Sequence, residues 1–162
     1  MDARADIAPW LDAQQQRSWR SYLVGTALLT ERLDRDLREN HDLSLPEYEI
    51  LSRLSEAPGR CMRMASLAAS ANYSRSRVTH TVARLEQAGW VERSPVLNDG
   101  RGVEAALTPA GLSMLEEAAP THVRGVREFL VDLAGDEFPI VGAVFERVLD
   151  TLIDDHPAMD IR

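Results

Sequence analysis

A segment in the middle of the chain combines arginines with hydroxyl and imidazole side chains at helical spacing. Ser74 is typical of a helix N-cap, and helical spacing continues from it to Gly89. At 100° per residue, Val78, Val82 and Leu85 share one side, which we expect to be buried. The other side and its flanks carry Arg75, Ser76, Arg77, Thr79, His80 and Arg84. With Ser74, these groups suit hydrogen bonding to phosphates and base edges, and arginine can bind guanine O6 and N7 together. An ordinary solvated helix surface would look similar, so this segment alone leaves both interpretations open.

The flanking segments predict how this helix is held. A short helix over 64–71 and a tight turn precede it, which is the geometry of a helix-turn-helix. A strand at 90–93, a turn at 98–102 and a return strand at 103–107 follow it and predict a β-hairpin.

Four further helices are predicted around this unit. Capping boxes open the first two, with Asp12 and Gln15 in one and Ser44 and Glu47 in the other. The third begins at 108–109, is expected to bend or break near Pro120, and continues to about 134. The last covers about 137–155. The first and last are amphipathic with few neighbours in their own chain, so we expect them to pair with a second copy.

The predicted fold class is mainly α with a small β-hairpin wing (α+β). It is a winged helix-turn-helix with long N- and C-terminal dimerisation helices. We expect a dimerisation region at 1–43, a DNA-binding domain at 44–108 and further dimerisation helices at 109–162.

The distribution of charge along the chain favours nucleic-acid binding more than the net charge does. The chain has 162 residues and a net charge of −8. Between residues 57 and 107, however, seven arginines accompany only four acidic residues, while the rest of the chain is strongly acidic. A basic middle between acidic flanks suggests a nucleic-acid-binding face on an acidic body.

Composition argues against other classes. Cys61 is the only cysteine and is interpreted as an inert small hydrophobe in a loop, and the four histidines are scattered, so no metal or cofactor is expected. The chain has no GxSxG or phosphate-binding loop, which argues against an enzyme. It has no apolar run of spanning length and no secretory leader pattern, so we expect a cytoplasmic, nucleoid-associated protein.

The hairpin carries a resemblance to a known family. The segment Arg84–Val91, the turn Asp99-Gly100-Arg101-Gly102 and the stretch Leu107-Thr108-Pro109-Ala110-Gly111 resemble the wing signature of the multiple antibiotic resistance regulator (MarR) family. The resemblance implies a dimeric winged-helix transcription factor. It also implies that Arg101 reaches into the minor groove and that Asp99 orients this guanidinium or braces the hairpin. A local turn ion pair is the simpler alternative for these two residues.

The resemblance also implies regulation by a small aromatic or phenolic acid. Trp19, Tyr22, His41 and Tyr48 could line its cleft, with Arg20 or Arg53 meeting a carboxylate, although ordinary core packing would explain each residue equally well. The peroxide-sensing members carry a reactive cysteine near the start of the first long helix, and this chain has none there.

The leading functional prediction is a homodimeric repressor that binds double-stranded DNA at a pseudo-palindromic operator. The alternative is a winged-helix module that binds another protein without specific DNA binding, because the fold alone does not decide between the two.

Overall fold

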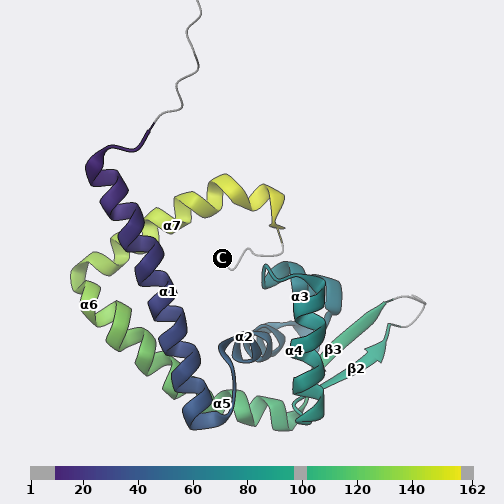
Figure 1. Ribbon diagram of the computed structural model, residues 1–162. Coiled ribbons are helices and arrows are strands. Elements are labelled where there is room, and N and C mark those ends of the chain that lie inside the picture. Colours follow the sequence, from purple (N-terminus) through teal and green to yellow (C-terminus); the bar gives the residue numbers. More distant parts are fainter. Residues whose placement is uncertain (1–9, 97–101, 158–162) are drawn as a thin grey trace, which may run out of the picture.

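A winged helix-turn-helix domain lies beside a body of long helices (Figure 1). The computed structural model describes residues 10–96 and 102–157. The long helices are α1 (Ala13–His41), α5 (Pro109–Val126) and α7 (Phe138–Leu152). The winged domain contains α2 (Leu45–Glu56), α3 (Met64–Ser70), α4 (Arg75–Gln87), β1 (Cys61–Arg63), β2 (Val91–Pro95) and β3 (Val103–Leu107). The shorter elements are η1 (Pro58–Arg60), η2 (Arg127–Val131), α6 (Asp132–Ala134), η3 (Gly135–Glu137) and η4 (Ile153–Asp155).

The predicted capping boxes determine where α1 and α2 begin. The Asp12 carboxylate accepts hydrogen bonds from the backbone N–H groups of Gln14 and Gln15, and the Gln15 side chain accepts one from the Asp12 N–H. Ser44 and Glu47 make the same reciprocal pair at the start of α2. Each box satisfies N–H groups that the helix itself cannot pair. Both predictions are confirmed.

The sheet has one strand more than the sequence predicts. The three strands are antiparallel in the order β1-β3-β2, and β1 places Arg63 opposite Glu104. The three residues of β1 are too few to show an alternating pattern, so the sequence places Cys61 in a loop. The structure places Cys61 in this strand. Its thiol pKa is raised, first by burial and then by Glu104, which disfavours the reactive thiolate.

Thr108 and Gly111 join the hairpin to α5. The Thr108 hydroxyl donates to the Gly89 carbonyl at 2.8 Å and accepts from the Gly111 N–H at 3.0 Å. A Cβ added at Gly111 would lie 2.0 Å from the carbonyl oxygen of Trp90. The first turn of α5 therefore packs directly on the backbone before β2, and no larger residue fits at position 111.

Helix α5 runs without a break through Pro120. The predicted break at this proline is wrong, because Leu115 and Ala118, which precede it in the helix, are buried in the core and hold this part of α5 in place. The irregular turn lies further along, where η2 has π-helical hydrogen bonding.

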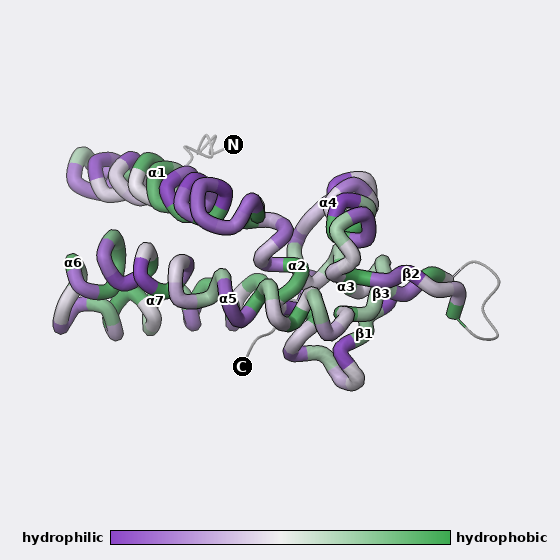
Figure 2. The backbone as a smooth tube through the Cα atoms, turned by 90° about the horizontal axis from the view of Figure 1, so that it is seen from below, coloured by the Kyte–Doolittle hydropathy of each residue, from purple (hydrophilic) through white to green (hydrophobic). Residues whose placement is uncertain are grey.

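The hydrophobic core belongs mainly to the winged domain. Buried leucines and valines from α2, α3, α4 and the hairpin form one cluster, which Leu33 and Leu37 of α1 and Leu115 of α5 complete. Helix α7 has no buried residue. Apolar residues along α1 and α7 lie away from the wing (Figure 2). In the part of the chain that the structure describes, no helix is long and apolar enough to cross a bilayer.

Candidate nucleic-acid interface

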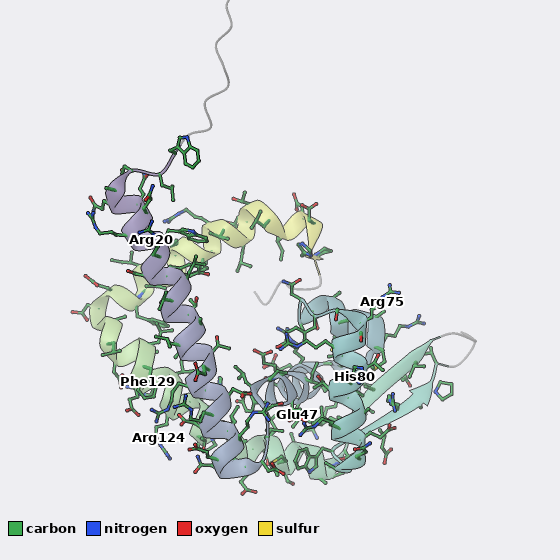
Figure 3. All side chains as sticks on the ribbon, viewed as in Figure 1. Arg20, Glu47, Arg75, His80, Arg124 and Phe129 are labelled. Atoms are coloured by element: carbon green, nitrogen blue, oxygen red, sulfur yellow. The ribbon has the colours of Figure 1, made fainter. Side chains whose placement is uncertain are left out.

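Helix α4 has the two faces that the sequence predicts. Val78, Val82 and Leu85 are buried against the core. Arg75 and His80 project from the side of α4 that faces away from α1 (Figure 3). All seven candidate contact residues on this helix are exposed: Ser74, Arg75, Ser76, Arg77, Thr79, His80 and Arg84. The helix thus presents hydroxyl, imidazole and guanidinium groups on one continuous surface.

Two of the hydroxyl groups have roles within the helix. Ser74 is the N-cap and accepts a hydrogen bond from the Arg77 N–H at 3.2 Å. Thr79 donates its hydroxyl proton to the Arg75 carbonyl at 2.8 Å. Each oxygen keeps acceptor capacity, but neither hydroxyl is as free as the sequence suggests.

Tyr73 supports Arg77 from the turn before α4. The guanidinium carbon of Arg77 lies 3.9 Å from the centroid of the Tyr73 ring, in a cation–π contact. The Tyr73 hydroxyl donates to Glu49 of α2. Burial, followed by this hydrogen bond, raises the pKa of Tyr73 to about 12, so the phenol stays protonated and can donate at neutral pH.

Arg84 has a partner that the sequence does not reveal. Its Nε lies 2.8 Å from Oε1 of Glu47, whose side chain is only 5% exposed. The Arg84 side chain itself is 61% exposed. Contact between α2 and α4 places this buried carboxylate beside the exposed face of α4.

A basic groove lies between α4 and the hairpin. It has a volume of about 470 Å³ and is lined by Arg63, Arg75, Thr79 and Arg93, together with apolar residues and backbone. Arg93 pairs with Glu86 at the end of α4, and this contact lowers the pKa of the Glu86 carboxyl. The sequence pattern does not reveal Arg63, because only the pairing of β1 with β3 brings it to this groove.

The tip of the wing lies outside the described residues. Asp99 and Arg101, which the family resemblance assigns to the wing, both fall in this gap. The strands that carry the tip are described on both sides, up to Val96 and from Gly102 onward.

The four residues expected to line a ligand cleft lie in two separate places. Trp19 stacks on Tyr22, whose ring also meets Phe145 of α7. His41 lies 22 residues beyond Trp19, which is about 33 Å along the helix. The four side chains therefore do not line one cleft within a single chain.

His41 and Tyr48 both contact α5. Tyr48 stacks on His122 with ring centroids 4.5 Å apart, and His41 Nε2 lies 2.8 Å from the Thr121 hydroxyl. Among the residues that the structure describes, the buried Nε of Arg53 on α2 has no hydrogen-bond partner. This second group is the only one of the two pairs that lies between the winged domain and the long helices.

The half-buried imidazole of His122 predicts a pH dependence of stability. Burial lowers its pKa from the ordinary value of 6.5, so the unfolded chain binds this proton more readily than the folded chain. The free energy of unfolding should be unaffected by this group above pH 6.5 and should fall as the pH drops below that value. Urea denaturation across this range should show a flatter profile for His122→Gln. The exposed His80→Gln should keep the wild-type slope, and an unchanged slope in His122→Gln would contradict the assignment.

Comparisons with known proteins agree with this geometry. The model of the MarR family matches residues 43–103. Sco3205 from Streptomyces coelicolor, a MarR family transcriptional regulator solved in complex with DNA, is 39% identical. The alignment has a TM-score of 0.83 and covers 88% of this chain and 94% of Sco3205. AbsC, another MarR family transcriptional regulator from Streptomyces coelicolor, is 36% identical, with a TM-score of 0.79 over 91% of this chain and 97% of AbsC.

A curated relative points the same way. The HTH-type transcriptional regulator PecS of Dickeya dadantii is 28% identical over 138 residues, which cover 82% of each chain. The similarity to these regulators extends through the terminal helices as well as the winged domain. The chain therefore belongs to the MarR family of winged-helix transcriptional regulators and is not an enzyme.

Proposed function

We propose that the protein is a homodimeric repressor that binds a pseudo-palindromic operator. Each subunit places α4 in the major groove, and the two half-sites lie about 34 Å apart, one turn of B-DNA. The observation that carries this proposal is the continuous exposed face of α4, which carries three arginines. The one carboxylate of this helix, Glu86, is paired with Arg93 of β2. The structure of Sco3205 in complex with DNA supports it.

Phosphate contacts come from the basic groove between α4 and the hairpin. A wing in the minor groove and a helix in the neighbouring major groove would place the intervening DNA strand across Arg63 and Arg75. Arg101, at the wing tip, would enter the minor groove, whose negative potential attracts arginine where it is narrow.

The terminal helices form the dimer interface. In this proposal the dimerisation regions are residues 1–43 and 109–162, and the DNA-binding domain is residues 44–108. Val141, Phe145 and Val148 form an exposed apolar face on α7. Trp19 and Leu23 continue this surface onto α1, where Tyr22 contacts Phe145. Burying such area stabilises an assembly by about 25 cal/mol per Å², and a second copy offers the same surface.

Salt dependence of DNA binding tests the proposal. Affinity for a duplex from upstream of the protein's own gene should exceed affinity for random duplex and should fall linearly on a log–log plot against salt. Arg75→Ala and Arg63→Ala should each reduce the slope by about 1, because each removes one phosphate contact. Arg124→Ala, on α5 far from α4 (Figure 3), should retain the wild-type slope. Equal affinity of the wild type for both duplexes would reject the proposal and favour a protein-binding module.

A small aromatic acid would release the DNA by binding between the winged domain and the long helices. Tyr48 offers an aromatic surface there, and Arg53 has an unpaired buried Nε to meet a carboxylate. Trp19 and Tyr22 would bind a ligand only as part of a separate site near the dimer interface. Salicylate and benzoate, added to labelled complex, should release DNA from the wild type and not from Arg53→Met. Release that is equal in both would exclude this site.

A further inference from the structure

Two glutamates of α2 support arginines of α4, Glu47 by a direct contact with Arg84 and Glu49 through the ring of Tyr73. We infer that Glu47 and Glu49 are positioning residues: they hold Arg84 and Arg77 in the orientation in which these arginines read DNA bases. The inference rests on the proposed function, since it concerns how the DNA-reading face is kept in order.

Glu47 holds Arg84 directly. The Oε2 atom of its carboxylate accepts from the Ser44 N–H at 2.8 Å and from the Ser44 hydroxyl at 2.5 Å. The Oε1 atom faces Arg84 Nε at 2.8 Å. Both oxygens are thus occupied, and the Ser44 contacts fix the carboxylate to the first turn of α2. A carboxylate buried this deeply needs such partners, so Arg84 cannot leave it without a penalty.

The pairing through Nε leaves the other edge of Arg84 available. Nη1 and Nη2 have no hydrogen bond in residues 10–96 and 102–157, and the side chain is 61% exposed. A guanidinium is planar and rigid, so an ion pair at Nε restricts the directions that the two terminal nitrogens can take. These are the atoms that bind guanine O6 and N7 or a phosphate. Glu47 therefore removes much of the side-chain freedom that Arg84 would otherwise lose on binding DNA.

Glu49 acts on Arg77 through Tyr73. The carboxylate accepts the Tyr73 hydroxyl, and the Arg77 guanidinium lies over the face of the same ring. Arg77 and Arg84 are seven residues apart and so lie two turns apart on one face of α4. Helix α2 thus supports two arginines on one side of α4, one by an ion pair and one through an aromatic ring.

A double-mutant cycle in the full-length protein tests the inference. Glu47→Gln keeps the shape and a hydrogen bond to Ser44 but removes the charge that holds Arg84. We expect it to lower affinity for the upstream duplex by about 10-fold, as the loss of one good base contact would. The salt slope should not change. Glu47→Gln with Arg84→Ala should bind no more weakly than Arg84→Ala alone, because both changes disrupt one contact. Independent, multiplying losses would overturn the inference, as would wild-type affinity in Glu47→Gln.

Two further variants keep the test decisive. Arg84→Lys retains the positive charge, but its single ammonium group cannot pair with Glu47 and also present two separate donors to a base. This variant should therefore lose the preference for the upstream duplex over random duplex. Full preference in Arg84→Lys would overturn the inference even if Glu47→Gln does not fold. Tyr73→Phe removes only the hydroxyl that reaches Glu49 and should weaken binding in the same way as Glu49→Gln. If the wild type itself shows no preference, the proposed function fails, and this outcome is separate from any result of the variants.

Discussion

Gly111→Ala is expected to lower the free energy of unfolding by about 3 kcal/mol or more. The added methyl group would lie 2.0 Å from the Trp90 carbonyl oxygen and 2.8 Å from Leu107 Cδ1. The first of these contacts is with backbone, so a side-chain rotation does not relieve it. Alanine gains up to about 1 kcal/mol over glycine in a helix, which offsets only part of the clash. Chemical denaturation followed by circular dichroism measures the change.

Ser113→Ala is the matched control for this variant. Position 113 is exposed on the same helix, and its hydroxyl bonds only to the Pro109 carbonyl of its own helix. Its stability should stay within about 0.5 kcal/mol of the wild type. Wild-type stability in Gly111→Ala would mean that α5 does not pack on the backbone before β2 as described.

Charges placed on the apolar face of α7 should separate the proposed dimer. Val141→Asp combined with Val148→Asp puts two carboxylates on a face that also carries Phe145. Burying an unpaired carboxylate in an interface costs several kcal/mol, so the variant should be a monomer at micromolar concentration. Operator affinity should fall by a factor of 10² to 10⁴, roughly the gain that linking two binding modules provides.

Analytical ultracentrifugation and DNA binding on the same samples check this prediction. Glu146→Gln changes an exposed residue of α7 outside this apolar face and should leave both mass and affinity unchanged. Because α7 contributes no buried residue, the double variant should keep the helical content of the wild type. A variant that stays dimeric would show that the terminal helices do not form the interface.

The local features of the fold could be predicted because short sequence patterns determine them. The side chain of Asp12 reaches only its own helix start, and Ser74 does the same for α4. Burial of Val78, Val82 and Leu85 follows from helical periodicity alone. These predictions needed no knowledge of what lies across the core.

The features that the sequence did not reveal depend on contacts between distant segments. Strand β1 forms because β3, about 40 residues later, supplies its hydrogen-bond partners. Glu47 reads as a helix cap in the sequence, and its second role appears only when α2 packs on α4. Pro120 signals a break, but the core contacts of its neighbours override this local preference. The grouping of Trp19 and Tyr22 with His41 and Tyr48 followed from the family resemblance, and the length of α1 between Trp19 and His41 separates the two pairs within one chain.

Hydrogen bonds at the base of the hairpin restrict how DNA binding by this regulator can be controlled. Glu86 of α4 is bonded to Arg93 of β2, and Thr108 ties the end of β3 to Gly89 just after α4. Helix α4 and the base of the hairpin are therefore bonded to each other and should move as one unit. In the proposed dimer, an effector would then act by changing the distance between the α4 helices of the two subunits. Each subunit would then release the DNA as a whole when this distance no longer matches the spacing of the two half-sites.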